Sequence, residues 1–162
     1  MKRILGLGAA ALMLTGCATE VEQTATLPAP APAITTDAPE AVFTPRDIAP
    51  VIITEDLKEI HYDEGLNIDV QILKTAYDYE HNASVFYLLI KNHNTVPLPV
   101  DAIAVFFDGG APVPEATIPL DLPLGPGAAT NLEYGFNVDY SKVRESRLTI
   151  GNLVYEGDLR SF

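Results

Sequence analysis

Cys17, the only cysteine of the chain, stands in the most informative chemical context of any residue. The segment before it comprises the basic pair Lys2-Arg3, the apolar run Ile4–Leu14 and the small residues Thr15-Gly16. A basic start, an apolar segment and small residues at a cleavage point are typical of a secretory signal. The apolar run is too short to span a membrane, which takes about 20 apolar residues. The sequence therefore predicts a signal peptide over residues 1–16.

The segment Leu14-Thr15-Gly16-Cys17 resembles the lipobox of bacterial lipoproteins. The resemblance implies cleavage between Gly16 and Cys17, with acylation of both the Cys17 sulfur and the new amino terminus. Two or three acyl chains hold a protein on a membrane, at about 0.8 kcal/mol per buried CH₂. Ala18 stands where inner-membrane lipoproteins of Gram-negative bacteria typically carry Asp. In such a host, the resemblance implies a lipid anchor in the outer membrane and a domain that faces the periplasm.

The histidines, serines and glycines do not form a catalytic or metal-binding motif. His81 and His93 lie in turns at opposite ends of one predicted strand, about 30 Å apart, which is too far to share a metal ion. No serine stands in a Gly-x-Ser-x-Gly elbow. Gly109-Gly110 and Gly125-Pro126-Gly127 lack the helix and lysine of a phosphate-binding loop. We therefore predict a protein that is not an enzyme and that has neither a cofactor nor a metal site.

Acidic residues gather ahead of the first strong strand, at Glu55, Asp56, Glu59, Asp63 and Glu64. They are either solvated turn residues or oxygen ligands for Ca²⁺, although they lack the spacing of an EF-hand loop. The formal net charge of −12 becomes −14 once the two basic residues of the signal are removed. An acidic chain repels nucleic acid and anionic lipid, so we predict no nucleic-acid partner.

Residues 17–50 are predicted to be a lipidated cysteine followed by a disordered tether. Six prolines are separated by Ala, Thr and acidic residues without apolar periodicity, at positions 28, 30, 32, 39, 45 and 50. Such a segment buries too little apolar surface to offset the entropy of ordering, and it favours extended polyproline conformations. Its aromatic residue, Phe43, is a candidate for docking elsewhere on the protein.

Residues 51–162 are predicted to form one all-β domain. Apolar and polar residues alternate between Leu66 and Ile72, as in a strand with one solvated face. The apolar phase then moves to Leu73, Tyr77 and Tyr79, which predicts a β-bulge near Leu73. Further strands are predicted at 84–91, 100–107, 130–138 and 147–155, with weaker ones at 57–62 and 116–120.

Turn signals rich in Gly, Asn and Asp separate these strands, and the single helical turn that we predict lies at Asp139–Arg144. About seven short strands without longer helices are typical of an antiparallel sandwich. The predicted fold is therefore an immunoglobulin-like β-sandwich preceded by the disordered tether.

The middle of the domain resembles the FxLYD-type immunoglobulin-like domains of bacterial envelope proteins. The resemblance lies in the order of three segments, Ile90-Lys91-Asn92, Val105-Phe106-Phe107-Asp108-Gly109 and Leu124-Gly125-Pro126-Gly127. It covers roughly residues 85–138, whereas the Pro97-Leu98-Pro99 segment and the proline-spaced stretch 112–123 are untypical. The resemblance supports a sandwich and implies no catalytic residues.

Segments 84–91 and 100–107 are predicted to pair as neighbouring strands, and both are apolar on two faces. Lys91 identifies the outward face of the first strand. The inward positions are then Phe86, Leu88 and Ile90 on the first strand and Ile103, Val105 and Phe107 on the second. The outward residues would form one exposed apolar patch, made of Val85, Tyr87, Leu89, Ala104 and Phe106. Such a patch is either a binding site or covered by residues 51–53 or 153–162 of the chain itself.

These patterns favour a membrane-anchored envelope lipoprotein that acts as a non-enzymatic protein–protein interaction module. Its expected partners are the membrane, through the lipid on Cys17, and another envelope protein. The alternative is an accessory module or inhibitor that binds a small molecule or a glycan.

Overall fold

The computed structural model describes residues 41–160 of the chain. The predicted signal peptide, Cys17 and residues 18–40 of the predicted tether lie outside this range. Among the described residues, no helix has the length and apolar character needed to cross a membrane.

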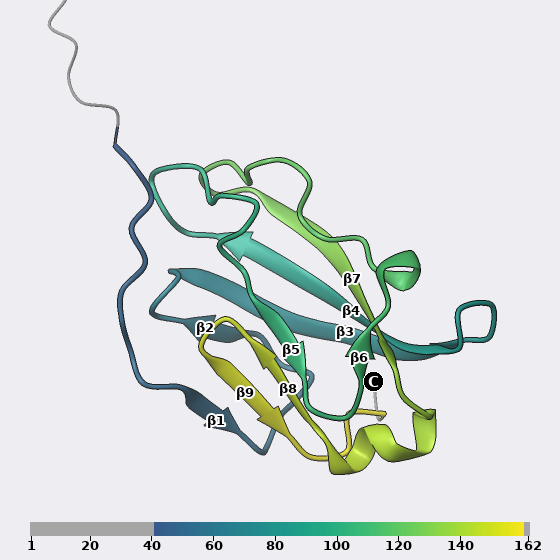
Figure 1. Cartoon of the computed structure of the whole chain (residues 1–162). Helices are drawn as coiled ribbons and strands as arrows, with labels where there is room; N and C mark the ends of the chain where they lie inside the picture. Colours follow the sequence, from purple (N-terminus) through teal and green to yellow (C-terminus); the bar gives the residue numbers. More distant parts are fainter. Residues whose placement is uncertain (1–40, 161–162) are drawn as a thin grey trace, which may run out of the picture. The chain divides into compact units, whose positions relative to one another are not determined.

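The described residues form nine strands in two sheets (Figure 1). The strands are β1 Val51–Ile53, β2 His61–Asp63, β3 Ile68–Asp78, β4 Ala83–Asn92, β5 Val105–Phe107, β6 Ala111–Pro112, β7 Ala129–Asn137, β8 Arg147–Ile150 and β9 Leu153–Glu156. The larger sheet has the order β2-β3-β4-β7-β6, and the smaller sheet has the order β1-β9-β8-β5. All neighbouring strands are antiparallel except β1 and β9, which run parallel.

This architecture confirms the predicted antiparallel β-sandwich and adds two strands to the expected number of about seven. One reason is that the predicted strand 147–155 is a hairpin, β8 and β9, which turns at Gly151 and Asn152. Gly151 has a φ of +57°, a conformation that favours glycine. The predicted helical turn is confirmed as the 3₁₀ helix η2, Tyr140–Glu145, and a second 3₁₀ helix, η1, spans Pro114–Ala116.

The β-bulge predicted near Leu73 is confirmed, because the register of β3 against β4 shifts between Ile72 and Lys74. Leu73 is the extra residue and is 43% exposed, and Thr75 takes the next inward position. Of the residues that carry the later apolar phase, Tyr79 lies just beyond the end of β3 and is 88% exposed. A bulge leaves one residue unpaired, so the inward side chains have even residue numbers before it and odd ones after it.

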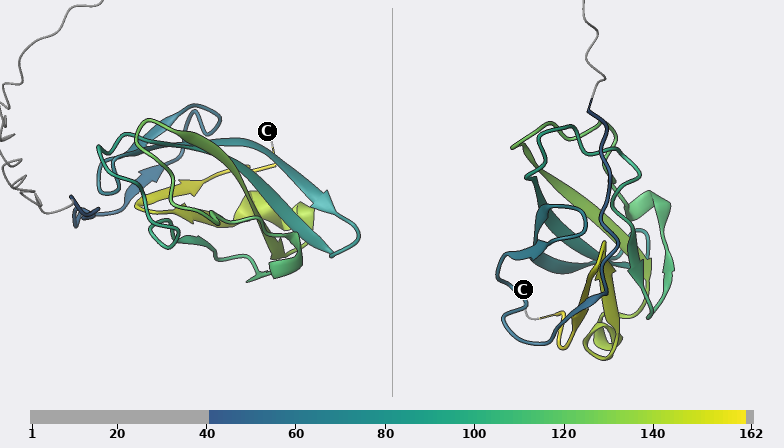
Figure 2. Two further views of the ribbon diagram at one scale, coloured as in Figure 1. Left: turned by 90° about the horizontal axis from the view of Figure 1, so that it is seen from above. Right: turned by 90° about the vertical axis from the view of Figure 1, so that its left-hand side faces the viewer.

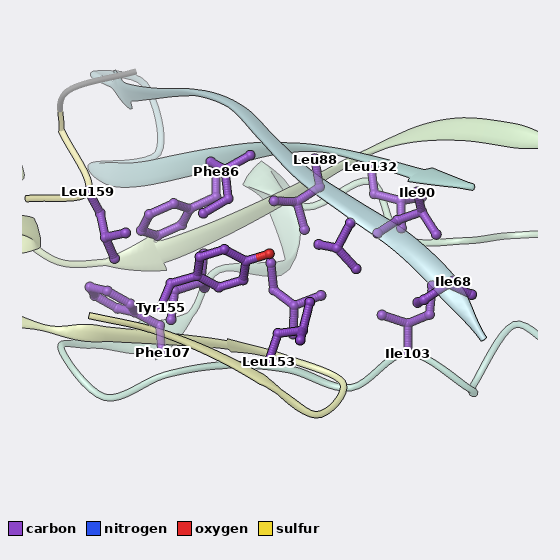
Figure 3. Close-up of a cluster of buried hydrophobic side chains, with 14 of the residues drawn as sticks. Ile68, Phe86, Leu88, Ile90, Ile103, Phe107, Leu132, Leu153, Tyr155 and Leu159 are labelled. Carbon is purple, nitrogen blue, oxygen red and sulfur yellow. The ribbon is translucent and has the colours of Figure 1, made fainter. Parts of the chain in front are cut away.

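The core lies between the two sheets (Figure 3). Phe86, Leu88 and Ile90 of β4 are fully buried, as predicted, and Phe86 lies across the core from Phe107 and Tyr155 of the smaller sheet. The ring centroids of Phe86 and Phe107 lie 5.2 Å apart, and both rings contact Phe136 of β7, at 6.0 Å and 5.3 Å. Aromatic packing of this kind joins the inner faces of two sheets into one core.

The predicted pairing of segments 84–91 and 100–107 is wrong. β4 lies between β3 and β7 in the larger sheet, whereas β5 pairs with β8 in the smaller one. Leu98 forms a bridge with Leu124, and the Ala102 N–H donates to the carbonyl oxygen of Pro99. The chain therefore turns between residues 98 and 104 and crosses from one sheet to the other before β5 begins.

Residues 41–50 contain no helix or strand, yet they contact the domain. Phe43 packs against the core, and the Arg46 N–H donates to the carbonyl oxygen of Gly65 at 2.8 Å. Contact with the domain thus begins ahead of the boundary at residue 51 that composition predicts, because one aromatic side chain and one backbone hydrogen bond hold this stretch.

Candidate functional site

The residues of the predicted apolar patch lie on two different sheets. Val85, Tyr87 and Leu89 belong to β4 and lie on the face of the larger sheet that points away from the core. Phe106 belongs to β5 of the smaller sheet, and Ala104 precedes that strand. The directions of these side chains follow the prediction, since Phe86 and Phe107 are buried beside them. The patch itself does not form as one surface, because the two strands are not neighbours.

On the larger sheet, the outer face of β4 is partly covered. Val85 is only 3% exposed and packs against Ala83 of the same strand and Ala116 of η1. The 3₁₀ helix reaches this position because Gly135 faces it from β7, where a Cβ atom would lie 2.5 Å from that of Ala116. Tyr87 is half-buried, and the ammonium of Lys74 lies 4.0 Å from its ring centroid. Proximity of a cation to the ring face stabilises this arrangement.

Leu89 lines a small pocket of about 60 Å³ on the same face. The other lining residues are Ile60, Asp69, Gln71, Lys91 and Ala129. Binding pockets for small molecules typically measure about 300–1,000 Å³, so this pocket is too small to enclose one. Charged and polar side chains thus border the apolar column of β4 on this face.

On the smaller sheet, Phe106 begins a row of side chains that crosses every strand. The register pairs Phe106 with Thr149 of β8, Thr149 with Val154 of β9, and Val154 with Ile52 of β1. Paired residues share one face of a sheet, and Phe107 and Tyr155 on the opposite face are buried, so this row faces outward. Phe106 is 63% exposed and Ile52 is 61% exposed. We call these four residues the Phe106 row.

The two segments that were predicted as possible covers of the apolar patch extend the Phe106 row instead. Residues 51–53 form β1 and residues 153–156 form β9; β9 pairs with β8, and β1 pairs with β9 at the edge of the sheet. A strand paired edge to edge enlarges a face and does not cover it. Sequence reasoning missed Ile52, Thr149 and Val154, although their apolar or β-branched side chains were the available signal. Beside the row, Arg147 and Glu156 form an ion pair at 2.8 Å.

The acidic cluster contains one residue with a clear structural role. Asp63 is fully buried, and its carboxylate accepts hydrogen bonds from Gly65, Leu66 and Asn152. Glu55, Asp56 and Glu59 are exposed. Within residues 41–160, no three His, Cys, Asp or Glu side chains gather closely enough to hold a metal ion.

The three histidines occupy separate environments. The His81 ring pairs with Asp78 at 2.7 Å, and the His93 ring pairs with Asp69 at 2.7 Å. His61 lies edge-on to Tyr155, with ring centroids 5.5 Å apart. The hydrogen bond from the His81 ring to the Asp78 carboxylate raises the pKa of His81 above its usual value, and the same bond lowers the pKa of Asp78. Both groups are charged together over a wider pH range than either isolated group would allow.

Comparison of the chain with protein-family models, curated proteins and solved structures finds no match to any of them. Functional inference therefore rests on the residues and on the geometry of these surfaces.

Proposed function

We propose that the protein is a membrane-anchored envelope lipoprotein that acts as a non-enzymatic protein–protein interaction module. The Phe106 row carries this proposal. It places an aromatic ring, two branched apolar side chains and one threonine in register across the smaller sheet. Exposed apolar surface of this kind is typical of protein contacts, where aromatic residues supply much of the binding energy.

The proposed anchor is the acylated Cys17, and the proposed location is the outer membrane, facing the periplasm. The lipobox-like segment that ends at Cys17 supports the anchor, and Ala18, at the position where inner-membrane lipoproteins of Gram-negative bacteria typically carry Asp, supports the location. We also propose that the domain is related to the FxLYD-type domains. Two of the three segments that carry the resemblance, 90–92 and 124–127, contact each other, which supports this proposal. The buried Asn92 side chain donates to the carbonyl oxygens of Leu124 and Gly125, at 2.8 Å and 3.2 Å. The partner that fits this setting is another envelope protein.

Lysine substitutions on the two sheets test the proposed interface. We expect Phe106→Lys to leave the fold unchanged by circular dichroism, because this side chain is mostly exposed. Loss of an aromatic anchor costs about 2 kcal/mol or more, so capture of a defined partner by crosslinking in cells should fall at least about 30-fold. Leu89→Lys is the matched control on the larger sheet, and it should retain capture. A folded Phe106→Lys protein that captures the same partner at the wild-type level would refute the proposed interface.

The anchor has its own test. Cys17→Ser removes the sulfur that would carry the acyl chain, so we expect an unacylated precursor that the lipoprotein peptidase does not cleave. Mass spectrometry of the native protein is the measurement. An unmodified Cys17 in the native protein would remove the basis for a lipid anchor.

An accessory module for a small molecule is the second candidate function. It is favoured by a hollow of about 260 Å³ lined by Tyr77, Tyr79, Asp139 and Tyr140. This hollow is separate from the Phe106 row and has a different chemistry.

A further inference from the structure

Three of the seven tyrosines of the chain line one hollow where β3 ends and η2 begins. The hollow measures about 260 Å³, and its lining residues are Tyr77, Tyr79, Asp139 and Tyr140. This volume lies just below the range of about 300–1,000 Å³ that is typical of small-molecule pockets, so the hollow has room for a small head group. We call these four residues the tyrosine cup.

Two of the rings in the tyrosine cup are held in place by their hydroxyl groups. The Tyr77 hydroxyl donates to Oδ1 of Asn82 across the β3–β4 turn. The Tyr140 hydroxyl donates to the carbonyl oxygen of Arg160 at 3.1 Å, with that of Thr75 at 3.4 Å. Because the protein itself engages both hydroxyls, the ring faces are the parts left to contact a ligand. Rings that are already oriented lose little entropy when a ligand binds.

Tyr79 completes the aromatic wall without contributing to the core. Its side chain is 88% exposed, and its ring lies edge-on to Tyr77, with centroids 5.0 Å apart and an interplanar angle of 76°. The two rings thus form adjacent walls that meet nearly at a right angle. The β3–β4 turn beside them lies at the end of the domain opposite residue 41, where the described chain begins (Figures 1 and 2).

Asp139 supplies the negative charge of the cup. Its Oδ1 accepts from the backbone N–H of Ser141 at 2.8 Å and from the Ser141 hydroxyl. These bonds lower the pKa of the Asp139 carboxyl, which keeps it ionised at neutral pH. Both bonds reach the same oxygen, which leaves Oδ2 without a partner in the described part of the chain.

The basic side chains near the cup differ in how strongly they repel a positively charged ligand. Arg160 forms an ion pair with Asp158 at 2.7 Å, so its charge is largely compensated. Lys142 lies close enough to lower the pKa of Asp139 and is the nearby cation that competes for this carboxylate. The formal net charge of −12 favours the approach of a positively charged ligand to the protein as a whole.

We propose that the tyrosine cup binds the ammonium head group of an organic cation. Aromatic ring faces attract cations through their quadrupole, and quaternary ammonium groups are bound by cages of such rings. The free carboxylate oxygen of Asp139 acts as the counter-ion. The site goes beyond the proposed protein interface, since it uses none of the residues of the Phe106 row.

Choline and 3,3-dimethyl-1-butanol form the matched pair of probes, because they share a shape and differ in charge. Saturation-transfer NMR with the full chain measures the affinity of each. Cation–ring attraction of about 0.5–2 kcal/mol predicts that choline binds about 2- to 30-fold more tightly than the neutral alcohol. Nα-acetyl-lysinamide is the second arm, and whichever cation binds more tightly distinguishes a free ammonium compound from the lysine of a partner. Equal binding of choline and the neutral alcohol, or no binding of either choline or Nα-acetyl-lysinamide, would overturn the proposal.

Variants of the cup assign the binding to its residues. Tyr79→Leu should weaken choline binding about 2- to 30-fold, whereas Tyr79→Phe keeps the ring and should retain it. Lys142→Gln should strengthen binding, because it removes the competing cation. Tyr62→Leu removes an exposed ring on β2, at the other end of β3, and should leave the affinity for choline unchanged. Since Tyr79 is almost fully exposed, its variants should keep the wild-type circular dichroism spectrum. Unchanged affinity in Tyr79→Leu, or weaker affinity in Lys142→Gln, would contradict a cation site here.

Discussion

Replacing Asp63 by Ala tests whether one buried carboxylate joins the two sheets. Oδ1 of Asp63 accepts from the backbone N–H groups of Gly65 at 2.9 Å and Leu66 at 3.0 Å, which orders the turn between β2 and β3. Asn152, in the turn between β8 and β9, donates its backbone N–H to Oδ2 at 2.8 Å and its side-chain amide to Oδ1 at 2.9 Å. One side chain of the larger sheet therefore binds a turn of the smaller one.

The expected loss in the free energy of unfolding depends on which hydrogen-bond donors lose their acceptor. The hydrogen bonds from Gly65 and Leu66 are buried, and an unsatisfied buried donor costs about 1–3 kcal/mol. The Asn152 donors are part-buried, so water replaces the carboxylate for them at lower cost. We therefore expect Asp63→Ala to lower the free energy of unfolding by about 2–6 kcal/mol. Asp63→Asn keeps an oxygen at the Oδ1 position but puts an amide donor where Oδ2 faces the Asn152 N–H, and this clash of two donors predicts about 1–3 kcal/mol.

Urea unfolding followed by circular dichroism measures these differences. With an m value of about 2 kcal/mol/M, a loss of about 4 kcal/mol lowers the midpoint by about 2 M. Glu55→Ala is the control, because this carboxylate of the same acidic cluster is exposed and should change stability by less than about 0.5 kcal/mol. A cost below about 1 kcal/mol for Asp63→Ala, or a greater cost for Asp63→Asn, would refute the reasoning.

Two further predictions concern a turn glycine and an ion pair. Gly151→Ala should lower the free energy of unfolding by about 2–4 kcal/mol, because φ is +57° and a Cβ would lie 2.4 Å from Oδ2 of Asp63. Gly125→Ala, with no atom within 4 Å of its added Cβ, should change it by less than about 1 kcal/mol in urea unfolding, and equal costs for the two would contradict the packing argument. The pKa of His81 is raised by Asp78, so the stability that His81 gains from this pair is complete below its unfolded pKa of about 6.5 and is lost as the pH rises through the folded value. NMR titration of the His81 ring should show the pKa falling toward about 6.5 in Asp78→Asn, and an unchanged pKa would show that Asp78 is not the cause.

Local patterns in the sequence determined most of the strands and the direction of their side chains. The alternation in β3 predicted its buried face, Lys91 predicted the outward face of β4, and the change of phase at Leu73 predicted the bulge. Phe86 and Phe107 point inward as predicted, even though their strands belong to different sheets. These properties were predictable because side-chain alternation is a property of a single strand and needs no knowledge of its neighbour.

The functional surfaces depended on contacts that no local pattern contains. The Phe106 row exists because β9 pairs with β8 and β1 pairs with β9, and the tyrosine cup exists because η2 returns to the end of β3. Apolar composition alone placed Phe106 next to Tyr87, on a strand pairing that the turn at residues 98–104 prevents.

The sequence by itself thus determined the fold class and the inward and outward sides of the long strands, whereas the tertiary structure decided which outward sides share a surface. Asp63 illustrates the difference, because its carboxylate looks like any acidic turn residue until Asn152, far along the chain, donates to it. A strand encodes its own alternation in its residues. Its neighbour is selected by the burial and hydrogen bonding of the whole sheet, since register and pairing are stable only when every buried face is satisfied together.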